Sequence, residues 1–213
     1  MKVTLFGATG KTGPYLIEEG LKRQMDITVF ARTGSEFDDP RVKVVRGSLT
    51  DNKALRAAIC GADAVVSALG PTRFPHPQGM PITTATKAII AAMKDEGVSR
   101  FVATSTGTAP DVGDTYDWKI RLPALLIRFA MATTYRDIIG LAEAIRNSGL
   151  DWTMVRLAVL NHSAPAQKLN VGLYGKTRHS WTVSRADAAA FMLNQLGESN
   201  FSKAAPGISA VTK

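Results

Sequence analysis

The 213-residue sequence predicts one α/β domain with a doubly wound parallel sheet, and three observations support this fold class. Apolar runs of strand length alternate along the chain with segments that have the apolar spacing of helices, which is typical of βαβ units. Some runs, such as Ala64-Val65-Val66, are apolar throughout, as expected for strands covered on both faces. A hydrophobic content of 45% in a chain of this length is enough for one compact core.

The individual elements follow from these patterns. Apolar runs rich in β-formers predict six strands, at residues 3–6, 27–31, 42–45, 62–68, 100–104 and 152–156. Apolar residues at helical spacing predict helices around residues 16–21, 82–93, 138–145 and 188–196. Ser184 is the predicted N-cap of the last of these helices, because Asp187 follows it three residues later.

Three segments show neither pattern and are expected to be substrate loops, at residues 71–81, 107–134 and 157–183. Each follows a predicted strand, and ligands of open α/β sheets bind beyond the carboxyl ends of the strands. Segment 107–134 is aromatic and then apolar, with Arg121 and Arg128 interspersed. It has three open interpretations: a lid over a flat aromatic substrate with arginines for an acidic group, a helix packed on the core, or the interface of a homodimer.

A glycine-rich loop follows the first predicted strand. Gly7, Gly10 and Gly13 allow a tight turn, a close approach of backbone to a pyrophosphate, and close packing of helix on strand. The N–H groups of the following helix are then available to the anion, and the side chains between the glycines can add contacts. A βα turn without a ligand is the alternative, since the spacing G-x-x-G-x-x-G departs from the common G-x-G-x-x-G. The sequence thus predicts a Rossmann-type dinucleotide site with contacts from Gly7, Thr9, Gly10, Lys11, Thr12 and Gly13.

The end of the second predicted strand indicates which dinucleotide binds. An acidic residue there would bind the ribose hydroxyls of NAD, but the sequence has Phe30-Ala31-Arg32-Thr33. Arg32 can form a bidentate pair with a 2′-phosphate, and Thr33 can donate to it. The alternative is a solvated arginine at a strand end. We therefore expect NADP(H) rather than NAD.

Several motifs together resemble a known group of proteins. The glycine loop with Ala31-Arg32 resembles the atypical short-chain dehydrogenase/reductases. Further motifs are similar to the NmrA-like branch, which includes flavin reductases of the biliverdin reductase B kind. These are Asp63–Val66, Gly97–Val102, Ser148–Thr153 and Val183–Asp187. The resemblance covers most of the chain and is weakest over 107–134 and after Asn161.

The resemblance implies further site residues. It places additional cofactor contacts at Ser48, Leu49, Leu69, Gly70 and Thr104. Ser48 stands where the family often has an aspartate facing the adenine, which weakens its assignment. The family's active-site serine corresponds to Thr106, with Ser105 as the alternative catalytic residue. A hydroxyl that caps the local backbone at a strand end is the competing interpretation for Thr106.

Many short-chain dehydrogenases donate a proton from a Tyr-x-x-x-Lys pair, and this sequence lacks one. The residues four positions after its tyrosines are Glu19, Ile120, Ile139 and Arg178. This argues against ordinary alcohol dehydrogenation. Tyr135 begins a predicted helix beside the expected pocket, but its spacing with Ile138 and Ile139 favours core packing.

Other polar residues are weaker candidates. His76, His162 and His179 lie in predicted loops without metal-ligand spacing, so no metal site is expected. His162 is interpreted as a surface histidine rather than an acid in the pocket. Arg156 ends the sixth predicted strand and is expected to be structural or part of an ion pair.

The composition limits the partners. A net charge of +8 arises from scattered residues, which favours a basic enzyme with a phosphorylated cofactor over a nucleic-acid-binding protein. The longest apolar stretch is too short and too charged to span a membrane. One cysteine, Cys60, and no recognisable signal peptide suit a cytoplasmic protein.

These expectations favour an NADPH-dependent reductase that transfers hydride to a flavin, quinone, tetrapyrrole or similar conjugated small molecule. Such acceptors can take hydride without a strong positioned acid, which suits the missing Tyr-Lys pair. A non-catalytic NADP(H) sensor of the NmrA kind is the second hypothesis. An epimerase or lyase is the third, and the absent tyrosine motif disfavours it.

Overall fold

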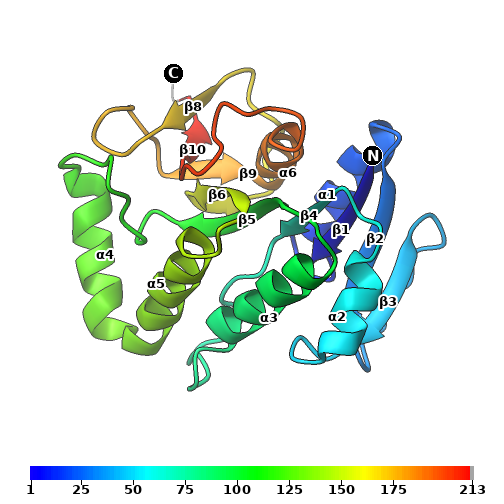
Figure 1. Cartoon of the computed structure of the whole chain (residues 1–213). Coiled ribbons are helices and arrows are strands. Elements are labelled where there is room, and N and C mark those ends of the chain that lie inside the picture. Colours follow the sequence, from blue (N-terminus) through cyan, green and yellow to red (C-terminus); the bar gives the residue numbers. More distant parts are fainter. Residues whose placement is uncertain (212–213) are drawn as a thin grey trace.

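The computed structural model describes residues 1–211, without the side chains of residues 119 and 123. Its centre is an eight-stranded sheet with the strand order β3-β2-β1-β4-β5-β6-β10-β8 (Figure 1). All neighbouring pairs are parallel except β10 and β8. The strands of this sheet are β1 (Lys2–Phe6), β2 (Asp26–Arg32), β3 (Lys43–Gly47), β4 (Ala64–Ser67), β5 (Arg100–Thr106), β6 (Asp151–Leu157), β8 (Leu169–Gly172) and β10 (Gly207–Ala210). A separate parallel pair joins β7 (Val159–Asn161) and β9 (Thr182–Ser184).

Helices cover both faces of the sheet and bury two apolar clusters. The helices are α1 (Gly13–Lys22), α2 (Asn52–Ile59), α3 (Pro81–Asp95), α4 (Trp118–Ala130), α5 (Ala132–Arg146) and α6 (Arg185–Asn194). Apolar residues of α2, α3 and α5 form one cluster against the sheet, and those of α1 and α6 form the other. Helix α4 lies at the outer side of α5, away from the sheet (Figure 1). The predicted fold class, a Rossmann-type doubly wound α/β sheet, is confirmed.

The predicted strands and helices are present, and the structure adds two helices, α2 and α4, and the strands β7, β8, β9 and β10. Ser184 caps α6 as expected, since its Oγ accepts the backbone N–H of Asp187 at 3.0 Å. Of the two added helices, α2 is capped by Asp51, which accepts the backbone N–H of Ala54 at 3.2 Å. This cap and the buried face of Leu55 and Ile59 are local signals that could have revealed the helix.

Two of the three expected loops contain regular structure. Residues 118–130 form helix α4, and residues 157–183 contribute strands β7 and β8. The pairing of β8 with β10 joins segments far apart in the chain, so a local pattern does not reveal it. The third expected loop is irregular over residues 71–80, and Pro81 begins α3. His76 attaches this segment to α5 by a 2.8 Å contact between Nε2 and the carboxylate of Asp137. No described helix is long and apolar enough to cross a membrane.

The sheet reverses its winding direction between β1 and β4, which fixes where a ligand can bind. From β1 the chain proceeds outward through β2 and β3, and it then returns to add β4, β5 and β6 on the other side. In open α/β sheets the ligand crevice lies beyond the carboxyl ends of the strands at this reversal. The glycine-rich loop follows β1 at that edge.

Candidate functional site

The glycine-rich loop is shaped by close backbone contacts. Gly7 has a φ of +77°, and a Cβ there would lie 2.8 Å from the carbonyl carbon of Ala68, just after β4. A Cβ on Gly13 would lie 1.5 Å from the backbone oxygen of Ala8. The loop therefore folds tightly between β1, β4 and the start of α1, and both positions require glycine.

The start of helix α1 has an open N-terminus. Thr12 is its N-cap, but the Thr12 side chain makes no capping hydrogen bond, and the first turn has no acidic residue. The preceding Thr9, Gly10 and Lys11 are exposed. Gly13 already donates its N–H to the backbone oxygen of Gly10, and Pro14 has no N–H. Among the described residues, the N–H groups of Thr12 and Tyr15 have no acceptor, and with no acid to compete they provide an anion site. This arrangement fits a cofactor pyrophosphate.

Arg32 lies at the carboxyl end of β2, where it is exposed together with Thr33. Within residues 1–211 its guanidinium has no hydrogen bond or ion pair. The neighbouring Arg46 already has partners, because it donates to the backbone oxygens of Ser35 and Phe37 and so holds the loop after β2. Arg32 is thus available to an anionic ligand beside the glycine loop.

The residues after β3 and β4 lie at the same edge of the sheet. The hydroxyl of Ser48 lies 2.9 Å from that of Thr50, in the turn before α2, so it has a local partner. Leu49 is half-buried against the core. Leu69 and Gly70 are half-buried after β4, and the Thr104 hydroxyl donates to the backbone oxygen of Leu69 at 3.3 Å. The structure thus brings all the predicted cofactor residues to one edge.

The two candidate catalytic hydroxyls at the end of β5 differ in environment. Ser105 is buried, and its hydroxyl has no hydrogen-bond partner among the described residues. Thr106 is half-buried and shares a 2.5 Å hydrogen bond with the hydroxyl of Thr108. Thr108 in turn lines a cavity. The geometry therefore favours Thr106 over Ser105 as the hydroxyl that can interact with a ligand in the cavity, through its hydrogen bond to Thr108.

This cavity, of about 620 Å³, lies beyond β5 between residues 107–117 and helices α4 and α5. Its volume is typical of small-molecule sites. Three tyrosines line it, Tyr116, Tyr135 and Tyr174, together with Arg121 and Arg128 of α4. Tyr135 is half-buried on the cavity wall, so the expectation that it packs in the core is wrong. The sequence placed Tyr135 beside the expected pocket, and the position of α4 next to α5 decides between a pocket wall and core packing.

Helix α4 covers the cavity with one face and exposes the other. Ile120, Ala124 and Leu125 line the cavity with the two arginines, and Leu125, at its rim, is still 48% exposed. Leu126 and Phe129, in contrast, are 61% and 76% exposed. This exposure contradicts a helix buried in the core, while the cover over a substrate pocket and the interface of a homodimer both remain predictions.

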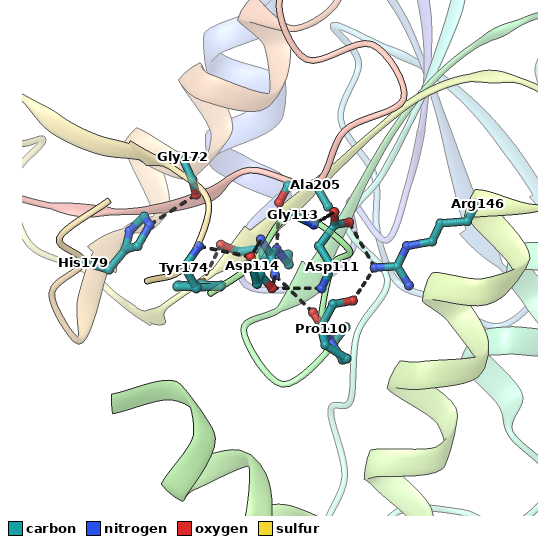
Figure 2. A network of polar contacts seen from close by, with 11 residues as sticks. Pro110, Asp111, Gly113, Asp114, Arg146, Gly172, Tyr174, His179 and Ala205 are labelled. Atoms are coloured by element: carbon teal, nitrogen blue, oxygen red, sulfur yellow. Dashed lines mark hydrogen bonds and ion pairs between the residues drawn. The ribbon is translucent and has the colours of Figure 1, made fainter. Parts of the chain in front are cut away.

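A buried polar network fixes the cavity wall formed by residues 107–117. Arg156 is fully buried and pairs with both carboxylate oxygens of Asp114, at 2.5 and 2.7 Å. Asp114 also accepts the backbone N–H of Tyr174, and Arg146 donates to Pro110 and Asp111 on the same segment (Figure 2). The expectation that Arg156 is an ion-pair residue is confirmed. Its role is to hold the pocket wall from inside the sheet.

Electrostatics make this network a poor source of protons. Burial raises the pKa of Tyr174 to about 12, and its hydroxyl donates to the backbone oxygen of Arg156. Burial lowers the pKa of His179, whose ring lies 4.7 Å from that of Tyr174. At neutral pH both groups are therefore neutral. We interpret them as supports of the pocket wall.

The other histidines are also accounted for. His162 is exposed, as expected, and its Nδ1 lies 3.0 Å from the hydroxyl of Tyr15 at the start of α1. His76 is buried against Asp137, which also accepts the backbone N–H groups of Ile82 and Thr83 at the start of α3. Among the described residues no group of three or more His, Cys, Asp or Glu is placed to hold a metal ion.

Known proteins share this fold. A crystal structure of a short-chain dehydrogenase/reductase from Veillonella parvula DSM 2008 superposes with a TM-score of 0.79 at 18% identity, over 98% of this chain and 94% of that one. A structure from the same organism in complex with NADP gives 0.75 at 19% identity, with the same coverage of both chains. At these identities the likeness establishes the fold alone.

Sequence comparison gives the family. An uncharacterized chloroplastic protein of Arabidopsis thaliana is 28% identical over 178 residues, which are 77% of this chain and 61% of that protein. The chain spans 30% to 61% of the length of such curated relatives. A family model described as NAD(P)H-binding matches residues 7–199. The chain therefore belongs to the NAD(P)H-binding family of Rossmann-fold proteins.

Proposed function

We propose that the protein is an NADPH-dependent reductase that transfers hydride to a flavin, quinone, tetrapyrrole or similar conjugated acceptor. The observation that carries this proposal is the tyrosine-lined cavity beyond β5, at the same sheet edge as the glycine loop and Arg32. Aromatic side chains and a volume of about 620 Å³ suit a flat ring system.

The residues present fit an NADP(H) molecule. The cradle at Gly7 and Gly13, which a Cβ would fill, and the open N-terminus of α1 fit the pyrophosphate. Arg32 and Thr33 fit the 2′-phosphate, and Leu49 and Leu69 supply apolar surface. When bound, the cofactor supplies the hydride. The protein holds it at the edge of the sheet that adjoins the cavity.

The cavity residues position the acceptor. The hydroxyls of Thr106 and Thr108 form a polar pair at the end of β5 that can hold an oxygen or nitrogen of the acceptor. Helix α4 covers the ring with Ile120 and Ala124. Ile139 follows Tyr135 at the position where a Tyr-Lys pair would have its lysine. This favours acceptors that need orientation more than a strong acid.

Within the family, the motifs that resemble the NmrA-like branch support a place near the flavin reductases. The absent lysine after Tyr135 agrees with this placement, and the tyrosine-lined cavity provides the flat pocket that such acceptors need.

The test of the function is steady-state oxidation of NADPH with FMN, a quinone and biliverdin. We expect at least one of these acceptors to be reduced, at a rate well above the rate without protein. Tight NADPH binding without turnover on a broad panel of acceptors would contradict the reductase and favour a redox sensor.

Arg32→Ala is expected to weaken NADPH binding by roughly 10- to 100-fold, because it removes charge-assisted hydrogen bonds to the 2′-phosphate. NADH lacks that phosphate, so its affinity should change little. Fluorescence titration of both cofactors measures the two effects.

Arg41→Ala is the matched control, since Arg41 is also an exposed arginine but already pairs with Glu18 and Asp39 at 2.6 and 2.8 Å. It should leave both affinities unchanged. An equal loss for NADPH and NADH in Arg32→Ala would refute the 2′-phosphate assignment.

Thr106→Val is expected to lower kcat roughly tenfold and to leave cofactor affinity unchanged, because the hydroxyl orients the acceptor rather than the cofactor. Thr106→Ser keeps the hydroxyl and should restore most of the rate. The measurement is kcat and NADPH dissociation constant for each variant. An unchanged rate in Thr106→Val, with a loss in Ser105→Ala, would transfer the role to Ser105.

A further inference from the structure

Two arginines of α4 in the cavity lack a carboxylate partner. Arg121 lies over the ring of Tyr116, with its guanidinium carbon 5.4 Å from the ring centroid. Arg128 makes no hydrogen bond or ion pair with any part of the chain that the structure describes. Both side chains line the cavity. They are therefore cations without a protein counter-ion, next to an aromatic wall.

Among the described residues, no carboxylate of the cavity forms an ion pair with Arg121 or Arg128. Asp111 pairs with Arg146 at 3.2 Å, and Asp114 pairs with Arg156. Asp117 also lines the cavity and has an interaction of its own. Arg146 and Arg156 do not line the cavity, so they hold the carboxylates of Asp111 and Asp114 from behind the cavity wall. The positive charges of Arg121 and Arg128 are therefore available to an anionic ligand.

The spacing of the two arginines suggests the shape of that ligand. Arg121 and Arg128 are seven residues apart on one helix face, which corresponds to roughly 10 Å along the axis. The cavity-lining residues between them, Ala124 and Leu125, are apolar. This face thus presents an apolar strip with a guanidinium at each end. It matches a flat apolar ring that bears an acidic substituent at its periphery.

We propose that the cavity selects conjugated acceptors that carry an anionic group, a carboxylate or a phosphate, and that Arg121 and Arg128 bind this group. This inference rests on the reductase function proposed above and names its substrate class. Guanidinium groups bind both anions through paired N–H donors, so the two chemistries share one recognition device.

Matched acceptors isolate the anionic group. Anthraquinone-2-carboxylate and its carboxamide share one ring system, and FMN differs from riboflavin by its phosphate. We expect the wild-type protein to show a kcat/KM roughly tenfold higher for the charged member of at least one pair, as for an exposed charge-assisted contact. A preference in the quinone pair would identify a carboxylate as the anionic group that the arginines bind, and a preference in the flavin pair would identify a phosphate.

The double variant Arg121→Gln/Arg128→Gln should abolish this preference, because the charged acceptor of each pair loses more kcat/KM than its neutral partner. Arg136→Gln is the matched control, because Arg136 is an exposed arginine of α5 outside the cavity lining. It should keep the preference. Equal kcat/KM for charged and neutral acceptors in the wild type, or a preference that persists in the double variant, would overturn the anion site.

Isothermal titration with the same four compounds, in the presence of NADP⁺, separates this inference from the reductase function. If no acceptor is reduced but the charged compounds bind wild type more tightly than the double variant, the reductase fails and the anion site stands. If acceptors are reduced but affinity and kcat/KM are the same for charged and neutral acceptors, the anion site is refuted and the reductase function stands.

Discussion

Replacing Asp114 with Asn is expected to lower the free energy of unfolding by about 3–5 kcal/mol, because it leaves a buried arginine without its counter-ion. Arg156 is fully buried, and the side chain of Asp114 is 15% exposed. The remaining partners of the guanidinium are all neutral, namely the backbone oxygens of Ala109 and Ala205 and the ring of Tyr174, whose centroid lies 4.5 Å away. For a chain of this length the expected fall in melting temperature is roughly 10 °C. Thermal and urea unfolding measure it.

Asp111→Asn is the control for this variant. Asp111 lies on the same segment and pairs with Arg146, but that contact is longer, at 3.2 Å, and the Arg146 side chain is 26% exposed. Pairs of this kind contribute about 0–1 kcal/mol. A loss in Asp114→Asn no larger than that in Asp111→Asn would show that the Arg156 pair does not hold the pocket wall.

The dependence on pH gives an independent check of the same pair. Burial acts to raise the pKa of Asp114, but hydrogen bonds from Arg156 and the backbone outweigh it, so its folded pKa lies below the ordinary 3.8. The stabilisation is therefore fully present above that ordinary value and is lost as the pH falls through the folded pKa. The difference in stability between wild type and Asp114→Asn should stay constant from neutral pH to about pH 5 and shrink in stronger acid.

The features that local sequence could predict are those whose causes are local. The strands around the glycine loop are apolar runs, and the N-cap at Ser184 is a contact over three residues. Arg32 was identified by its distance from the loop along the chain, which the parallel register of β1 and β2 converts into proximity at one sheet edge. These parts of the site depend on spacing within one βαβ unit.

The cavity could not be predicted because its walls meet only in three dimensions. Tyr135 was expected beside the pocket, but its helical spacing also suits a core position, and the placement of α4 beside α5 decides between the two. Arg156 and Asp114 are 42 positions apart, so no local pattern relates them. The cofactor half of the site was therefore accessible from sequence, and the acceptor half required the tertiary arrangement.

Gly13→Ala is expected to reduce NADP(H) affinity by more than roughly 100-fold, because the loop cannot keep its shape with a side chain there. The new Cβ would lie 1.5 Å from the backbone oxygen of Ala8 and 2.2 Å from its carbonyl carbon. These are backbone atoms, so the start of α1 or the loop itself must move. Either movement misaligns the N–H groups that the cofactor pyrophosphate would contact. Fluorescence titration with NADPH measures the loss.

Two further glycines separate a failure of the loop from a failure of the fold. Gly197→Ala meets no atom within 4 Å and should leave both melting temperature and affinity unchanged. Gly10→Ala places its Cβ 3.2 Å from the backbone oxygen of Gly7, a tight contact rather than a clash, so its melting temperature should stay near that of wild type. A weakened affinity in Gly10→Ala then reports how closely the cofactor approaches the loop. Wild-type affinity in Gly13→Ala would mean that the pyrophosphate binds elsewhere, because no rearranged loop retains the same set of backbone donors.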